Sequence, residues 1–471
     1  MSLSRDLTLE NLDLSYRTSI AYQYGRYAMS LNYDMFPEEV LHAAKRSLLD
    51  TIGCAIGAYE AEGFPIVQKL AKDLGGNEEA TVFGTGLRTT ATNVTLANVF
   101  LVHYLGYNDL GGGGHNSDTI PAILAVAERE KANGRDFLTS MIMSYELGAR
   151  FSESPGGFEC YEALGFPFDI RGGVTLPPCI GKLMGLNEMQ IANAIGICAS
   201  HSLPLGVLDT NHEEHFHAKN LRMGFVARDA IESCILAKHG FTGPIRVIEG
   251  DHGFREVVMK GQMYLDKAVD WSGWRILNVK FKNLCLNSTT MGQVQATLKI
   301  VIDNNLYPED IASVKIGTGY RDYMHTASLP KKFPRNAETV DHGAFYANAV
   351  AIRDHRYTTN AMNPNNYDDP VILDLIDKIS IKPHPDLGEW SSGGITEITT
   401  KDGRTFVEKV AHPYGLGAED LSDAELEKKF YDMASKYFSD NDIQHMFDII
   451  WNVEKLSDIS TLAKMTILPQ K

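Results

Sequence analysis

The chain has 471 residues, of which 44% are apolar and 22% are charged, and its formal net charge is -16. This length supplies enough apolar residues for a sizeable core and predicts two or three domains. The negative charge argues against binding to nucleic acid or to an anionic membrane surface, because both need a basic face. We therefore expect no nucleic-acid partner and no membrane partner.

The helical patterns begin early and continue to about Trp274. The segment from Pro37 to about Tyr59 starts with Pro and two Glu, and its apolar residues recur near helical spacing. Further helices are predicted over residues 90–105, 119–133, 134–151, 174–186, 188–202 and 220–239. Loops rich in Gly, Pro or polar residues separate these helices at 107–121, 152–173 and 208–219.

The pattern changes after Trp274. Alternating apolar residues predict strands at 276–281 and 311–317, and a hairpin over 395–410 that turns at Asp402 and Gly403. Helices are predicted at 291–304, 344–354, 422–437 and 440–455. We predict a mainly α protein with a large helical domain built from both chain ends, 1–274 and 412–471, and a smaller α+β lid domain, 275–411.

Cysteine usage and the N-terminus indicate the compartment. The six cysteines form no C-x-x-C pair, so neither a disulfide framework nor a thiolate zinc site is predicted. The first residues mix charges with apolar residues, unlike a signal peptide, and no run reaches the roughly 18 apolar residues of a membrane span. We expect a cytoplasmic protein, with an organelle matrix as the alternative.

One loop concentrates flexible backbone, an acid and an imidazole. Residues 107–121 read Y-N-D-L-G-G-G-G-H-N-S-D-T-I-P, with Asp109 and His115 on either side of four glycines. Each glycine would cost a helix about 1 kcal/mol relative to Ala, but it lets backbone N–H groups approach an anion closely. We interpret this loop as the floor of an active site. The alternative is a surface loop whose glycines only make turns.

The segment H-E-E-H-F-H at 212–217 looks at first like a set of metal ligands. Its histidines lie at i, i+3 and i+5, which is not the H-E-x-x-H spacing of a helical zinc site, and its polar flanks indicate a loop. We therefore predict no metal site.

Seven groups of motifs occur in order along nearly the whole chain. They are L-L-D-T-I-G-C-A-I-G-A at 48–58, Y-N-D and H-N-S-D-T-I-P-A at 107–122, G-K-L-M-G-L at 181–186, A-K-N-L-R-M-G-F-V-A-R at 218–228, G-F-T-G-P and G-D-H-G-F at 240–254, F-K-N-L-C-L-N-S-T-T-M at 281–291, and E-T-V-D-H-G-A-F-Y at 338–346. This order resembles the MmgE/PrpD family, which includes 2-methylcitrate dehydratases, cis-aconitate decarboxylases and iminodisuccinate epimerases. The resemblance implies a large helical domain, an α+β lid, a homodimer, and no metal or organic cofactor.

The resemblance also carries active-site positions over to this chain. Asp109 and His115 match the acid and the histidine of the family's loop after its early helices. Lys219 matches the lysine of its K-x-L-H-x-G motif. Lys282 matches the lysine that opens its K-x-Y-P-C-C segment, and Tyr346 matches the tyrosine of its D-H-S-x-x-Y motif.

Several histidines of the family pattern are absent. The chain has G-F-P-F at 165–168 where the family has G-F-H-P-T, and Arg222 stands where K-x-L-H-x-G has its histidine. Met291 replaces the histidine at the end of the K-x-Y segment, and Asn287 lies near a position that some members fill with a further His. Such a site need not perform the reaction of a methylcitrate dehydratase.

The family reactions share one step, proton transfer at a carbon beside a carboxylate, which needs a base and cations over the developing enolate. We assign Lys219 and His115 as the proton-transfer pair, Asp109 as the residue that orients either of them, and Tyr346 as a donor or acid. Arginine and a solvated lysine bind carboxylates well. The predicted substrate-binding residues are Lys282, Arg222 and Arg171. By residue type alone, any of these cations could instead be solvated surface.

We predict a lyase, a dehydratase or decarboxylase, that acts on a small citrate-like di- or tricarboxylate. One alternative is an epimerase or isomerase of a dicarboxylate such as iminodisuccinate, which the loss of histidines able to protonate a leaving hydroxide favours. The other is a non-catalytic homologue that keeps a dicarboxylate pocket.

Overall fold

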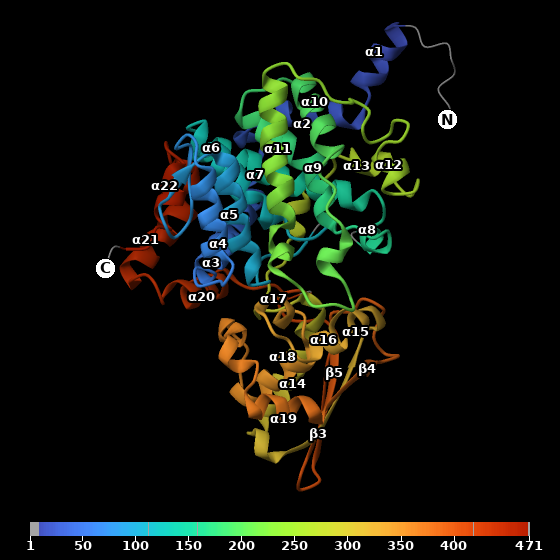
Figure 1. Cartoon of the computed structure of the whole chain (residues 1–471), viewed down its shortest axis with the longest axis vertical. Coiled ribbons are helices and arrows are strands. Elements are labelled where there is room, and N and C mark those ends of the chain that lie inside the picture. The colour runs from blue at the N-terminus through green and yellow to red at the C-terminus, as the bar shows by residue number, and fades with distance from the viewer. Residues whose placement is uncertain (1–8, 112, 158, 418, 470–471) are drawn as a thin grey trace.

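A computed structural model describes residues 9–111, 113–157, 159–417 and 419–469. Figure 1 shows a larger helical part and, below it, a smaller part that holds the main sheet, so the predicted mainly α fold with a small α+β part is confirmed. Among the described residues, no helix combines the length and the apolar character that crossing a bilayer requires. The domain boundaries at 274 and 412 stay predictions.

The helices that the sequence predicts for the larger part begin and end close to their predicted bounds, and further helices that it did not predict accompany them. Thr90 and Asn187 each cap a helix, with their side chains accepting the backbone N–H of Asn93 and Gln190. The longer helices are α2 (Ile20–Ser30), α3 (Glu38–Gly57), α4 (Phe64–Leu74), α5 (Ala91–Tyr104), α6 (Ile120–Arg129), α7 (Gly134–Glu153), α9 (Gly172–Leu183), α10 (Glu188–Ala199) and α11 (Arg222–Lys238). Most of α5 is buried, because it is apolar on nearly every side. Its C-terminal end leads into the glycine loop.

The last helices of the chain return to this part. Figure 1 shows α20 (Asp423–Ala434), α21 (Asp440–Trp451) and α22 (Ser460–Lys464) in red beside the blue N-terminal helices, and α20 packs against α3. Ser422 and Ser439 open α20 and α21 with capping boxes. Both ends of the chain therefore build the helical part.

The smaller part contains a four-stranded sheet in the order β4-β3-β5-β6. β3 (Ile311–Thr318) is parallel to β4 (Ile379–Pro383) and antiparallel to β5 (Gly394–Thr400), and β5 forms a hairpin with β6 (Thr405–Val410). Gly403 in the turn has φ 87°, which confirms the predicted hairpin. The accompanying helices include α14 (Ser288–Asp303), α15 (Tyr320–Thr326), α17 (Ala337–Val340), α18 (Ala344–Asp354) and α19 (Pro370–Lys378).

The strand predicted over 276–281 is wrong. Residues Arg275–Asn278 form a 3₁₀ helix, η6, and Lys280 makes only an isolated bridge with Leu110. The backbone N–H of Ile276 donates to the buried carboxylate of Glu146 on α7 instead of to a strand. The sequence alternation therefore reflects burial against helices and not a place in a sheet.

Candidate active site

A buried cavity of about 230 Å³ lies where the two parts of the molecule meet. The helical part contributes His103, Gly106, Leu110, Gly114, His115, Glu162, Phe168, Asp209, Lys219 and Arg222. The segments after residue 280 contribute Lys282, Asn287, Ser288, Thr289, His325, Asp341, His342, Trp390 and Ser392. Four of the seven predicted site residues therefore line one cavity, although they come from distant parts of the chain.

The glycine loop forms one wall of this cavity. Gly113 and Gly114 have φ of 101° and 118°, a conformation that other residues rarely adopt. A Cβ on Gly113 would lie 2.0 Å from Ser152 Oγ, so the loop passes too close to α7 for any side chain. Gly112 lies outside the described residues. The glycines are thus needed for close packing around His115, which shapes the cavity wall.

His115 presents one ring nitrogen to the cavity. Its Nδ1–H donates to the backbone carbonyl of Asp109, which leaves Nε2 as the unprotonated nitrogen of a neutral ring. Burial lowers the pKa of His115 well below its ordinary value, and the nearby Lys282 lowers it further, although Asp118 opposes both effects. His115 is therefore neutral near pH 7 and able to accept a proton.

The Asp109 side chain lies beside the cavity wall and points elsewhere. Its carboxylate accepts hydrogen bonds from the Ser117 N–H and hydroxyl and from Tyr145 Oη, the last at 2.7 Å. Burial raises its pKa to about 7, and these hydrogen bonds hold it from rising further. In the structure, Asp109 orients His115 through its backbone carbonyl, and its carboxylate fixes the loop against α7.

Two lysines face the cavity, and each has a partner in the protein. Lys219, in the 3₁₀ helix η5 (His217–Leu221) that precedes α11, has its Nζ 3.4 Å from Asp341 Oδ2. Lys282 donates to the carbonyl of Gly106, and burial lowers its pKa, with Lys219 and Lys429 adding to the effect and Asp341 opposing it. Two cationic groups therefore meet around the Asp341 carboxylate.

Arg222 is already paired with two carboxylates. Its Nε lies 3.2 Å from Asp169 Oδ2 and its Nη1 lies 2.6 Å from Asp209 Oδ2, while its guanidinium covers the Phe168 ring at 5.4 Å. The two carboxylates balance the charge of Arg222, although among its donors Nη1 hydrogen-bonds Asp209 while the buried Nε makes no hydrogen bond to a described residue. Arg222 therefore borders the cavity and mainly holds Asp209 in place.

Neither Arg171 nor Tyr346 is among the described residues that line the cavity. Arg171 donates to the Gly113 carbonyl and to Asn116 Oδ1, so it supports the glycine loop from behind. The Tyr346 hydroxyl donates to the Ala361 carbonyl at 2.7 Å. Both side chains are buried and serve the fold in this geometry, and the function proposed below does not use them.

Sequence reasoning missed a cluster of imidazoles around Asp209. Asp209 Oδ1 lies 3.5 Å from His215 Nε2, 3.5 Å from His342 Nε2 and 3.9 Å from His325 Nε2. His215 belongs to the histidine-rich loop, and His342 stands in the E-T-V-D-H motif, so both lay in segments that the sequence had singled out. His325 had no local signal, because only the fold brings α15 to this place.

The ligand atoms of Asp209, His215 and His342 lie within 4.8 Å of one another, so these three residues could hold a metal ion. The surroundings oppose this. Arg222 already neutralises the Asp209 carboxylate, and the nearby Lys219 would repel a dication.

A second missed group is His103, at the end of α5. Its Nδ1 lies 2.8 Å from Asp118 Oδ2, and the ring lies edge-on to His115 with centroids 5.5 Å apart. Asn108 Nδ2 donates to the other oxygen of Asp118 at 2.9 Å. A buried carboxylate therefore fixes the orientation of a second cavity imidazole.

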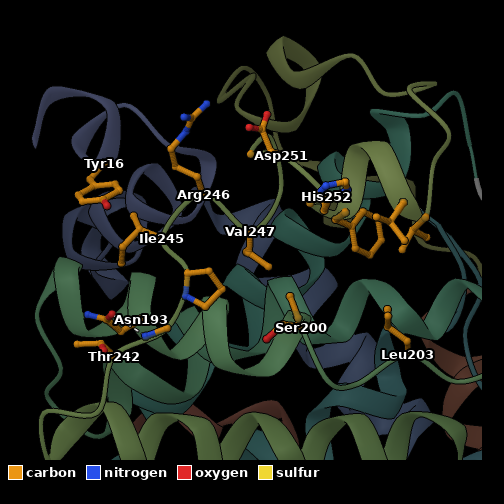
Figure 2. Close-up of a pocket in the computed structure, with 18 of the residues that line it drawn as sticks. Tyr16, Asn193, Ser200, Leu203, Thr242, Ile245, Arg246, Val247, Asp251 and His252 are labelled. Carbon is orange, nitrogen blue, oxygen red and sulfur yellow. Dashed lines mark hydrogen bonds between the residues drawn. The ribbon is translucent and has the colours of Figure 1, made fainter. Parts of the chain in front are cut away.

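A larger and more open hollow of about 880 Å³ lies elsewhere, between α1 (Leu9–Arg17), α10 and the loop after α11 (Figure 2). Figure 2 shows Arg246, Asp251 and His252 around its rim, and the last two are exposed. Among the described residues, no predicted site residue lines this hollow. Its size therefore does not make it the better candidate for catalysis.

Family models match the two parts of the chain separately. The MmgE/PrpD N-terminal domain matches residues 23–265, and the MmgE/PrpD C-terminal domain matches residues 286–455. The chain belongs to the MmgE/PrpD family. The match confirms the family that the ordered motifs indicated, and both matched regions contribute residues to the cavity.

The similar proteins are lyases by name. A human cis-aconitate decarboxylase is 23% identical, with 95% of this chain and 94% of the relative covered. A cis-aconitate decarboxylase of Aspergillus terreus is 22% identical, with 99% of both chains covered. The 2-methylcitrate dehydratase of Escherichia coli K12 is 23% identical, with 75% of this chain and 76% of the relative covered. The homodimer and the cytoplasmic location stay predictions.

Proposed function

We propose that this MmgE/PrpD member is a lyase that removes water or carbon dioxide from a small citrate-like di- or tricarboxylate. The observation that carries the proposal is the meeting of a neutral imidazole, His115, with the two lysines Lys219 and Lys282 in one buried cavity. The names of the relatives, decarboxylases and dehydratases of citrate-like acids, support the same reaction class.

His115 is the base in this proposal. Its Nε2 takes a proton from the carbon beside a substrate carboxylate, or the carboxylate itself leaves as carbon dioxide, and in both cases an enolate-like charge develops. Lys219 and Lys282 stabilise that charge, since fixed cations in a water-poor cavity act strongly on developing charge. Asp341 holds the Lys219 ammonium at this place.

The epimerase alternative depended on a shortage of histidines. The cavity instead contains His103, His325 and His342 in addition to His115. None of these three stands at a position where the family pattern has a histidine that this chain lacks. A supply of imidazoles able to protonate a leaving group suits a lyase. No feature of the cavity favours epimerisation over elimination.

The test is turnover and hydrogen exchange in D₂O with a panel of di- and tricarboxylates. The wild type should convert at least one acid and place deuterium on the carbon beside a carboxylate. His115→Gln and Lys219→Met should each lower turnover at least roughly 100-fold in a folded protein. Lys238→Met, at the exposed end of α11, is the matched control and should behave as the wild type.

Three other outcomes would overturn the proposal. Tight binding without exchange or conversion would indicate a non-catalytic homologue. Label appearing in an inverted isomer without loss of water or carbon dioxide would indicate an epimerase. Near-normal turnover in a folded His115→Gln variant would remove His115 from the reaction.

A further inference from the structure

His103 and His115 are two neighbouring imidazoles in different electrostatic settings. Each ring has its Nδ1 held from behind, His115 by the Asp109 carbonyl and His103 by the Asp118 carboxylate. Both rings line the cavity, so each has Nε2 as the nitrogen left for a substrate. They differ in one respect, because a carboxylate stabilises an imidazolium and a carbonyl does so far less.

The closeness of the two rings makes this difference matter. With ring centroids 5.5 Å apart in a buried site, a proton on one ring disfavours a proton on the other. Of the two rings, His103 has the stronger anionic partner and is therefore the better placed to hold a shared proton. His115 stays neutral.

The charged groups around His115 act in both directions, with a net lowering of its pKa. Burial, Lys282 and His103 lower the pKa of His115, whereas Asp118 and the hydrogen bond to Asp109 raise it. Asp118 is fully buried, which by itself would raise its pKa, yet its pKa lies below the ordinary value because of His103, His115 and Arg222. Asp118 is therefore ionised and able to stabilise a positive charge on His103.

We propose that His103, held by Asp118, is the proton donor of the reaction, and that it works beside His115, the proton acceptor. The inference rests on the proposed lyase function. Two titratable groups whose surroundings separate their protonation states can take the opposite roles of acid and base. His103 is the catalytic group, and Asp118 is a positioning residue that acts through it.

The protons balance in either lyase reaction. In a dehydration, His115 takes H⁺ from carbon, the C–O bond breaks with both electrons going to oxygen, and His103 gives its proton so that water leaves. In a decarboxylation, the C–C bond breaks, carbon dioxide leaves, and His103 protonates the carbon that keeps the electron pair. Exchange with solvent then resets the two rings.

The first experiment measures kcat/KM against pH for the wild type and Asp118→Asn. The wild-type profile should fall at high pH, because a reaction that needs a protonated donor slows once that donor is deprotonated. Removing the carboxylate should move this alkaline fall to lower pH by at least about one unit, because an adjacent opposite charge shifts a pKa by about 1–3 units. An unchanged alkaline fall in an active, folded Asp118→Asn would overturn the proposal.

A second variant separates the acid from the base. His103→Gln keeps an amide that can donate to Asp118 but removes the titratable ring. In a dehydration, turnover should drop at least roughly 100-fold, while deuterium exchange at carbon, which uses His115, should stay within about tenfold of the wild type. In a decarboxylation, deuterium in the product should fall together with turnover, because His103 itself protonates the carbon. Equal losses of exchange and turnover on a substrate that loses water would contradict the division of roles. His42→Gln, which alters an exposed His–Asp pair with Asp423, is the control and should change neither rate.

A measurement on the unmodified protein covers the case in which both variants fail to fold. Histidine ¹⁵N chemical shifts should show one cavity ring as an imidazolium at pH 7 and its neighbour as a neutral Nδ1–H tautomer. Two neutral rings would overturn the proposal. Wild-type protein without turnover or exchange on any carboxylate would instead overturn the proposed lyase function, so the two failures are distinguishable.

Discussion

Replacing Lys429 by Met should destabilise the fold by about 3–5 kcal/mol. Lys429 lies on α20 near the end of the chain, and its Nζ is 2.6 Å from Asp50 Oδ1 on α3. The same amine donates to the carbonyls of Tyr107 at 2.7 Å and Lys282 at 3.0 Å. One ammonium thus joins the C-terminal helix, an N-terminal helix, the glycine loop and the segment that carries a cavity lysine.

The magnitude follows from what the substitution leaves behind. The side chains of Lys429 and Asp50 are 4% and 0% exposed, so Met would leave a carboxylate buried without its counter-charge. Removing one partner of a buried ion pair costs about 3–5 kcal/mol. The substitution also leaves the carbonyls of Tyr107 and Lys282 without this donor, which adds to the loss of stability. Burial raises the pKa of Asp50 and Lys429 opposes this, so protonation of Asp50 should reduce the loss at acidic pH.

Urea unfolding followed by circular dichroism measures the loss. The adjacent Lys428 offers a matched control, because it pairs with Asp432 on the same helix but the two side chains are 71% and 58% exposed. Lys428→Met should cost less than about 0.5 kcal/mol. The double variant Asp50→Asn with Lys429→Met should recover part of the loss, since it removes the unpaired charge. A Lys429→Met variant within about 1 kcal/mol of the wild type would refute the reasoning.

Three further predictions concern chelation of metal ions, the pH dependence of stability, and the space around Gly106. Exhaustive chelation with EDTA should leave turnover unchanged, because the Arg222 guanidinium already neutralises the Asp209 carboxylate of the His–Asp cluster. Activity that is lost on chelation and restored by one metal would contradict this. Burial lowers the pKa of Lys331 to about 8, so between pH 8 and about 10.5 the unfolded chain binds more protons. The contribution of Lys331 to stability should therefore rise by up to about 3 kcal/mol over that range, opposite in sign to the buried cysteines, whose pKa values burial raises. Urea unfolding across this range should show that the stability of the wild type relative to Lys331→Met rises with pH, and equal slopes would refute the assignment. Gly106→Ala should lower turnover at least about tenfold, because its Cβ would lie 2.3 Å from Asp341 Oδ1. Gly185→Ala is the control, since Gly185 also has a positive φ but has open space around it, and it should keep the wild-type rate. Equal rates in the two variants would refute the steric argument.

Local patterns sufficed for much of the fold, because capping and periodicity act over a few residues. Thr90 and Asn187 mark helix starts by accepting nearby N–H groups, and the Asp402–Gly403 turn closes the hairpin between adjacent strands. The strand β4 escaped prediction because it is short and follows α19 without a break. The segment at 276–281 was assigned wrongly because its hydrogen-bond partner, Glu146, is 130 residues away in the sequence.

The family motifs predicted which residues belong to the site, but not what those residues contact. Lys219, Lys282 and His115 meet in one cavity, but no motif states what each lysine touches. Arg222 looks like a carboxylate clamp in sequence, since arginine suits that task, yet the fold gives it Asp169 and Asp209 as partners. Pairing within the protein is a property of the tertiary structure, and it decides whether a cation is available to a substrate.

The histidines show the same limit most clearly. Comparing motif with motif suggests a site depleted of imidazoles, because that comparison considers each position alone. The cavity recovers imidazoles from the end of α5, from α15 and from the segment after α17, at His103, His325 and His342. A reacting group requires a proton donor at a point in space, and any element that reaches that point can supply it. Asp118 lies in the 3₁₀ helix Asn116–Thr119, just after the glycines, and it can hold His103 only because α5 ends beside it. The choice between elimination and epimerisation must therefore be argued from the cavity and not from the missing motif residues.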